Sequence, residues 1–158
     1  MQIPGDAIHT AEASIDVSAS PEVLFDMVSD IVRMGEWSPE ATGGHWLDGG
    51  SGEVGDWFMG DNTVDGRDWS RACQVAKADR GQDFTFVIGG FEANCTWWSY
   101  EFEPVDAGTR VTERWWMVNL TPGMQGASPE QRTQRVESTQ PNIDRTLAQL
   151  KEVAERRA

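Results

Sequence analysis

Six short segments with the residue alternation of β-strands follow one another between residues 44 and 120, and their connections are short. Turn-forming sequences stand in several of these connections, including Asp48-Gly49-Gly50, Asp65-Gly66 and Asp106-Ala107-Gly108. Strands spaced this closely favour an antiparallel meander, in which each strand pairs with its neighbour in sequence. The predicted strands are Gly44–Leu47, Asp56–Asn62, Arg67–Ala76, Asp83–Ile88, Asn94–Glu103 and Thr109–Leu120.

A strand and two short helices are predicted ahead of this meander. Apolar and polar residues alternate from Ala11 to Val17, which is the pattern of a half-buried strand. Ser20 and Pro21 then supply the cap and first position of a helix. A second short helix is predicted from Asp30 through Met34.

A long helix is predicted after the meander. Ser128-Pro129-Glu130-Gln131 has the form of a capping box, in which the serine and glutamine side chains satisfy backbone groups reciprocally. Pro141 lies inside the helical pattern and is expected to kink or break the helix near Gln140. The apolar stripe that defines the helix consists of Val136, Ile143, Leu147, Leu150 and Ala154. The element order therefore predicts an α+β fold.

Aromatic composition indicates what such a fold encloses. The chain holds eight tryptophans but only one tyrosine, Tyr100, in 158 residues. A twisted antiparallel sheet of this size curls, and one helix covers only part of its concave face. A cavity lined by large apolar side chains is the expected result.

Several sequence stretches resemble one known family. They are SASPEVLFDMVSDIVRMGEWSPE near the start, VGDWFMGDN, WSRACQV and FTF in the middle, then WSYEFEPVDAGTRVTE and TLAQLKEVAE. Together they are similar to the polyketide cyclase/dehydrase-like proteins of the START/Bet v 1 (SRPBCC) superfamily, over a core of about residues 11–156.

The resemblance implies a helix-grip fold. Its curved antiparallel sheet of about seven strands would wrap a long C-terminal helix, with two short helices after the first strand, as a single domain over residues 1–158. Such proteins bind hydrophobic ligands; some cyclise polyketides, others carry lipids and others act on chaperones. No cofactor is implied.

Strand alternation and one assumed turn place a carboxylate inside the predicted cavity. If residues 105–108 form the hairpin loop, Pro104 faces Thr109, and Tyr100 then lies opposite Glu113 on the inner face. Arg71 also falls in an inward register. A buried carboxylate is costly unless it is paired or hydrogen-bonded, so Tyr100, Arg71 or Asn62 is expected beside Glu113.

Two interpretations of this cluster remain open. A desolvated Glu113 could abstract a proton next to a carbonyl group, with Arg71 or Tyr100 stabilising the enolate. Alternatively, the cluster is a satisfied polar network that fixes the core, and Arg71 reaches past the sheet into solvent.

The remaining candidates would line or close the cavity. Resemblance favours an inward-facing Phe58 and Asn62 over the alternative register of Trp57 and Met59. Trp37 and Glu40 lie in a loop that could gate the cavity mouth, although Trp37 may equally plug the junction between helix and sheet. Cys73 is expected as a small core residue rather than a nucleophile. The full predicted lining is Phe25, Trp37, Glu40, Phe58, Asn62, Trp69, Cys73, Phe86, Trp98, Phe102, Trp115, Ile143 and Leu147.

Two further tryptophans are predicted on the outside of the sheet. Trp97 and Trp116 must point away from Trp98 and Trp115, since successive residues of a strand face opposite sides. The assumed register places them opposite each other, as an exposed apolar patch suited to a homodimer contact.

Charge argues against some partners. The chain has 26 acidic and 13 basic residues, a net charge of −13, and Arg33 is the one basic residue in positions 1–66. Nucleic acids and anionic membrane surfaces would be repelled. The acidic surface otherwise serves solubility.

Other sequence signals are weak or missing. No stretch is long and apolar enough for a membrane span, and the first residues do not have the form of a secretory signal. His9 and His45 have no ligand spacing for a metal. A disulfide between Cys73 and Cys95 is not expected, and a cytoplasmic protein with reduced thiols is the default interpretation.

The sequence therefore favours binding of a hydrophobic, aromatic or polycyclic small molecule in an internal cavity. The first alternative is a polyketide cyclase, aromatase or dehydratase that uses Glu113, Tyr100 and Arg71. The second is a protein-interaction module that uses the acidic face or the outer tryptophans.

Overall fold

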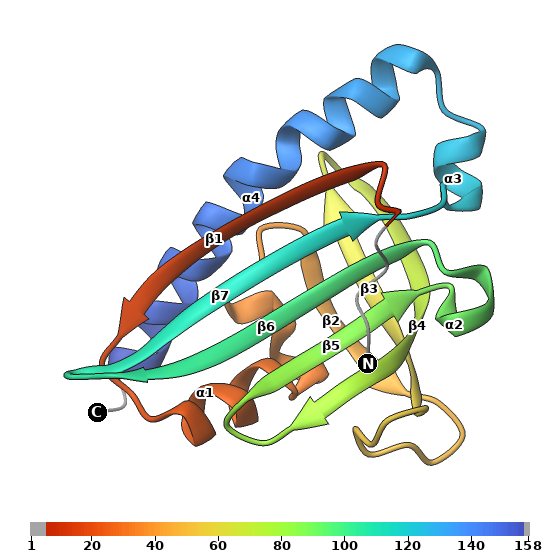
Figure 1. Ribbon diagram of the computed structural model, residues 1–158. Coiled ribbons are helices and arrows are strands. Elements are labelled where there is room, and N and C mark those ends of the chain that lie inside the picture. The colour runs from red at the N-terminus through yellow and green to blue at the C-terminus, as the bar shows by residue number, and fades with distance from the viewer. Residues whose placement is uncertain (1–5, 157–158) are drawn as a thin grey trace.

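The computed structural model describes residues 6–156 and contains one curved, seven-stranded antiparallel sheet that wraps a long C-terminal helix (Figure 1). The strand order across the sheet is β1-β7-β6-β5-β4-β3-β2, so consecutive strands from β2 to β7 pair and β1 returns beside β7. The strands are β1 (His9–Val17), β2 (Ala41–Trp46), β3 (Trp57–Val64), β4 (Arg67–Asp79), β5 (Asp83–Ile88), β6 (Thr96–Val105) and β7 (Gly108–Met117). This arrangement confirms the predicted α+β helix-grip fold.

The register of the β6–β7 hairpin is the one that the sequence predicts. Pro104 pairs with Thr109, and Tyr100 pairs with Glu113. The connection is tighter than the assumed loop, because Val105 and Gly108 also pair and leave only two residues in the turn. Every inner-face assignment on these two strands therefore holds.

Both ends of this region differ from the prediction. Asn94 is not in β6, because it adopts a left-handed conformation (φ 50°) that ends the short helix α2 (Gly90–Ala93). β7 ends at Met117 rather than Leu120, because the next two amides, of Val118 and Asn119, turn to the carbonyl of Cys95.

The predicted N-terminal helices are present. Helix α1 (Pro21–Val28) is capped by the Ser20 hydroxyl, which accepts from the amide of Val23, and the 3-10 helix η1 spans Ile31–Glu36. A short helix α3 (Pro122–Gln125), which the sequence analysis does not predict, precedes the long helix α4 (Pro129–Glu155). Ser128 and Gln131 form the predicted capping box of α4.

Pro141 does not break α4. The helix is continuous through it, so the expected break near Gln140 is wrong. Proline removes one backbone donor, but its neighbours Thr139 and Ile143 are buried and hold both adjoining turns against the protein. The Thr139 hydroxyl also donates to the carbonyl of Arg135 at 2.9 Å.

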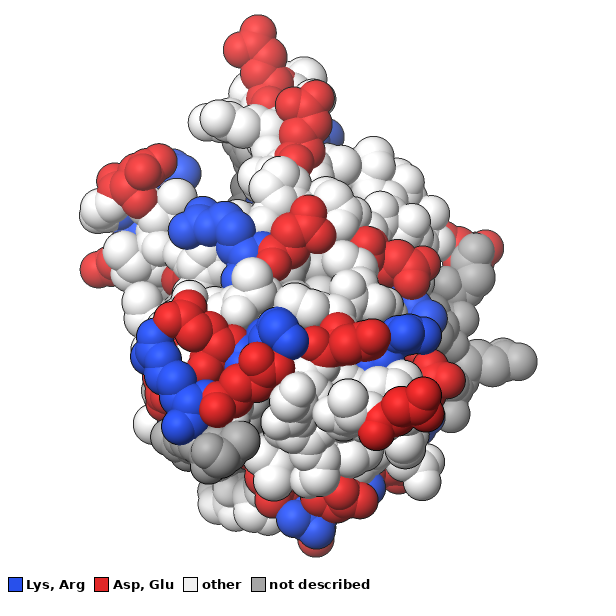
Figure 2. Space-filling model, turned by 90° about the vertical axis from the view of Figure 1, so that its left-hand side faces the viewer, with Lys and Arg blue, Asp and Glu red and all other residues white. Residues whose placement is uncertain are grey.

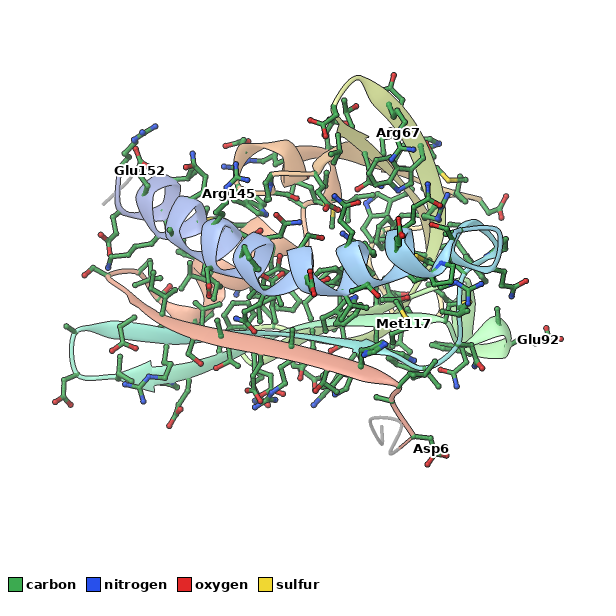
Figure 3. The ribbon with its side chains drawn as sticks, turned by 90° about the horizontal axis from the view of Figure 1, so that it is seen from above. Asp6, Arg67, Glu92, Met117, Arg145 and Glu152 are labelled. Atoms are coloured by element: carbon green, nitrogen blue, oxygen red, sulfur yellow. The ribbon has the colours of Figure 1, made fainter. Side chains whose placement is uncertain are left out.

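The two halves of α4 differ in their packing. We divide the helix before Thr139 into a first half, residues 129–138, and a second half, residues 139–155. Its buried residues all lie in the second half, which runs along β1: Thr139, Ile143, Thr146, Leu147, Leu150 and Ala154. In the first half, Val136 is only partly buried. Figure 3 shows α4 between the β1–β7 side of the sheet and the β3–β4 hairpin that carries Arg67. The sheet therefore grips the helix firmly at one end only.

The predicted exposed patch on the outer face is wrong. Trp97 and Trp116 do pair across β6 and β7, but they are only 6% and 9% exposed. They pack with Ala76 and Val87 in a second apolar cluster, and the Trp97 Nε1–H donates to Asn94 Oδ1 at 2.6 Å. Both indoles are buried in this cluster, so they do not form the exposed apolar patch that was expected as a dimer contact.

Surface charge is interleaved rather than segregated. On the face shown in Figure 2, acidic and basic side chains lie next to one another. Exposed ion pairs such as Arg80–Asp26 and Arg110–Asp16 contribute to this mixing. Among the described helices, none combines the length and apolar character needed to cross a bilayer.

Substitutions in the two halves of α4 should differ in their cost. Leu150→Ala removes a fully buried side chain and should lower the free energy of unfolding by roughly 2–5 kcal/mol. Val136→Ala should cost less than about 1 kcal/mol, and Gln149→Ala, at an exposed neighbouring position, should be almost neutral. Urea denaturation measures all three, and equal losses at positions 150 and 136 would contradict the asymmetric grip.

Candidate functional site

The inner face of the sheet is filled with aromatic rings at the end near α1. The Phe25 ring of α1 meets Phe84 and Phe102 edge-on, with centroids 6.1 and 6.3 Å apart. These three rings are buried, and Leu147 of α4 belongs to the same cluster. This end of the interior is closed by the protein's own side chains.

A buried carboxyl group lies on β7 in the middle of the interior. Glu113 is 2% exposed, with Tyr100 of β6 beside it on one side and Ala13 of β1 on the other. Burial raises the pKa of Glu113 to about 8, and hydrogen bonding with the Tyr100 hydroxyl offsets part of that rise. Burial, together with the adjacent Glu113, also raises the pKa of Tyr100 well above its usual value. Both groups are therefore predominantly uncharged at neutral pH.

Two buried polar atoms near this position have no hydrogen-bond partner. They are Glu113 Oε1 and Trp115 Nε1, and they are the two such side-chain atoms found in the described part of the chain. Trp115 follows Glu113 on the same face of β7 and is 1% exposed. An unpaired buried donor or acceptor costs on the order of 1–3 kcal/mol, so this pair requires an explanation.

Partly exposed aromatic side chains lie toward the opposite end, near α3. Trp98 pairs with Trp115 across the strands and meets it at 6.5 Å between ring centroids. Trp69 and Asn62 pair with each other on β4 and β3 and are also partly exposed. We refer to this region as the open end; it is bordered by Leu120, Met124 of α3 and Val136 of α4, which pack against the core.

Arg71 lies at the open end and not beside Glu113. A Cβ atom added to Gly123 of α3 would fall 2.7 Å from Arg71 Nη2, so the guanidinium group reaches α3. Its Nη1 donates to the carbonyl of Ser70 at 3.1 Å. The pKa of Glu113 is set by burial and by the hydrogen bond with Tyr100, and no cation contributes to it. Of the predicted polar cluster, the structure joins Glu113 to Tyr100 and places Arg71 and Asn62 elsewhere.

The Trp37–Glu40 loop is tied to the rest of the protein. Trp37 is buried in the main core, and Arg33 stacks over its ring at 5.4 Å, which favours the plug over the gate. Glu40 Oε1 accepts from Arg135 Nη1 and from Asn142 Nδ2, both at 2.7 Å. This one carboxylate therefore contacts α4 on both sides of Pro141.

The other predicted lining residues belong to the packed core. Phe58 meets Phe86 at 5.2 Å between centroids, and Ile143 of α4 is 1% exposed. Cys73 is buried, and burial raises the pKa of its thiol to about 12, which keeps it protonated and unreactive. Cys73 and Cys95 are both free thiols. The described residues hold no cluster of three or more His, Cys, Asp or Glu suited to a metal ion.

Neither of two well-formed surface pockets is lined by Glu113 or Tyr100. One lies outside the interior between η1, Glu40 and Thr63. The other lies where the β6–β7 turn meets Lys151.

Some relevant contacts are not predictable from the sequence pattern. The bonds from Arg135 and Asn142 to Glu40 join segments about 100 residues apart, and no local periodicity indicates them. The unpaired indole of Trp115 is also missed, although its inward register was predicted. Alternation gives the direction of a side chain but not whether its polar atom finds a partner.

The fold and its buried aromatic interior define a helix-grip protein. The chain matches the family model described as polyketide cyclase/dehydrase and lipid transport over residues 9–155. The chain belongs to this family. Membership supports a general role in ligand binding or in cyclisation. No curated protein among those compared matches the chain.

Solved structures show the same fold. The polyketide cyclase-like protein Cgl2372 from Corynebacterium glutamicum is 28% identical, with 92% of this chain and 91% of that one covered and a TM-score of 0.63. The di-domain ARO/CYC StfQ of the steffimycin biosynthetic pathway is 16% identical (96% and 52% covered, TM-score 0.70), so this chain spans about half of it. Ara h 8.0201 is also 16% identical (94% and 98% covered, TM-score 0.64).

Glu113 should make stability depend on pH. Between pH 4.5 and about 8, the carboxyl is protonated in the folded protein but ionised in the unfolded chain. The folded state then binds more protons, so this group's contribution to the free energy of unfolding falls as pH rises through that window. Glu113→Gln removes the effect, and its stability relative to wild type should increase by up to about 1.4 kcal/mol per pH unit.

Urea denaturation at pH 5, 6, 7 and 8 measures this difference. Glu137→Gln, at an exposed position of α4, is the matched control and should differ from wild type by a constant amount. If the difference in unfolding free energy between Glu113→Gln and wild type is likewise independent of pH, the carboxyl is not held neutral in the folded protein.

Proposed function

We propose that the protein binds an apolar small molecule with aromatic rings at the open end of its interior. The observation that carries this proposal is the partial exposure of Trp69 and Trp98, two large rings on the inner face of the sheet. They lie toward α3 and the first half of α4, which contributes no buried residue. Covering such surface with a ligand is favourable by roughly 25 cal/mol per Å² of apolar area.

Entry to the interior would require movement of α3 and the first half of α4, since Glu113 and Trp115 are buried. This segment is the least firmly packed part of the helix, as only Val136 and partly buried neighbours hold it to the core. The Glu40–Arg135 ion pair, with side chains 20% and 30% exposed, fixes it to the loop before β2. The first half of α4 would act as the cover of the site, and its second half as a fixed support.

A second candidate function is acid catalysis, which the uncharged state of Glu113 favours. A carboxyl group with a pKa of about 8 carries a proton at neutral pH and can give it to a leaving hydroxyl group, which departs as water. The carboxylate left behind can take the proton from the adjacent carbon as the double bond forms, which completes a dehydration and restores the carboxyl group. Tyr100 is placed to orient it. Arg71 would not take part, since its guanidinium lies against α3. A bound compound recovered chemically unchanged supports the binding function, whereas release of water from it supports catalysis.

Gly60 provides a position at which to block the site. It lies on the inner face of β3 between Phe58 and Asn62, and an added Cβ would meet its nearest atom, Phe58 Cε2, at 3.7 Å. Gly60→Leu should therefore fold and fill part of the interior. We expect it to weaken binding of the neutral fluorescent probe N-phenyl-1-naphthylamine at least tenfold in a fluorescence titration.

Met59→Leu, one residue away on the outer face, is the matched control and should bind the probe like wild type. Thermal unfolding establishes that both variants are folded. Equal probe binding by Gly60→Leu and wild type would place the ligand somewhere other than the interior.

A further inference from the structure

Glu113 Oε1 and Trp115 Nε1 form an acceptor and a donor that the protein leaves unpaired. Both are buried, and both project from the inner face of β7 because their residues are two apart on one strand. Residues two apart on a strand are separated by roughly 6.8 Å along it. A single oxygen atom that is hydrogen-bonded to both groups, at roughly 2.8 Å from each, bridges most of that distance.

The surroundings of the pair are apolar or uncharged. On β1, Ala13 lies beside Glu113 and Ala11 beside Trp115, and neither alanine side chain offers a hydrogen-bonding group. On β6, the neighbours are Tyr100 and Trp98. No lysine or arginine occupies any of these flanking positions, so an anionic group placed here would face a carboxyl without a compensating cation.

We propose that the ligand presents an uncharged hydroxyl group, phenolic or alcoholic, to this pair. The ligand O–H donates to Glu113 Oε1, and the same oxygen accepts from Trp115 Nε1–H. A hydroxyl satisfies both orphaned atoms at once, whereas a hydrocarbon satisfies neither and an ionised carboxylate would be buried without a compensating cation. This inference rests on the proposed function, because it assumes that an aromatic ligand enters the interior.

Three probes with the same ring system test the inference: naphthalene, 2-naphthol and 2-naphthoate. Their affinities are measured at pH 6.5 by displacement of N-phenyl-1-naphthylamine. We expect 2-naphthol to bind about tenfold more tightly than naphthalene, which is the worth of two modest hydrogen bonds. 2-Naphthoate should bind the least tightly of the three, because its carboxylate is ionised.

Variants then locate the hydroxyl. Trp115→Phe keeps an aromatic ring without the N–H, and Glu113→Leu replaces the carboxyl by an apolar side chain of similar size. Each substitution should reduce the advantage of 2-naphthol over naphthalene to about twofold or less. Trp97→Phe is the control, since that indole N–H already has a partner on the outer face and the advantage should persist. Thermal unfolding checks each variant, and Glu113→Leu suffices if Trp115→Phe does not fold.

The outcomes separate the two proposals. Equal affinities of wild type for naphthalene and 2-naphthol, as expected if only a water molecule pairs with these atoms, would overturn the hydroxyl inference and leave the binding function intact. The hydroxyl inference would also be overturned if 2-naphthoate bound more tightly than 2-naphthol. It would equally be overturned if Trp115→Phe and Glu113→Leu both kept the full advantage of 2-naphthol over naphthalene. If none of the three probes binds, the proposed function itself fails.

Discussion

The fold depends on one long helix covering a curved sheet that it cannot cover completely. The second half of α4 buries its apolar side chains along β1, and α1 closes the interior at the same end with Phe25. Residues 129–138 of α4 include no buried residue, and α3 connects this end of the helix to β7 (Figure 1). In the proposed function, stability and access to the interior are divided between the two halves of α4.

Much of this architecture can be predicted from local sequence patterns. Turn residues and strand alternation were enough to pair Tyr100 with Glu113, because a hairpin register is fixed once its turn is located. The capping box at Ser128 likewise begins α4 where expected. Such features depend only on neighbours in sequence or on one hairpin partner, so a single chain reveals them.

The sequence was misleading where packing between distant segments decides the outcome. Pro141 was expected to kink or break α4, but the helix does not break there, since buried neighbours on both sides hold it to the protein. Trp97 and Trp116 were expected to be exposed, but an outer cluster covers them. Arg71 has the inward register of a partner for Glu113, yet the curl of the sheet carries its guanidinium to α3 instead. Register gives a side chain's direction; the curvature of the sheet decides what it meets.

The central claim is that a hydroxyl-bearing aromatic ligand reaches the Trp115 indole beneath α4. Nuclear magnetic resonance of the ¹⁵N-labelled protein tests it directly, because every tryptophan gives its own indole N–H signal and Trp→Phe variants assign them. On addition of 2-naphthol, the Trp115 signal should move downfield while that of Trp97, already bonded to Asn94, stays in place. A Trp115 signal that does not move at saturating 2-naphthol would contradict the account.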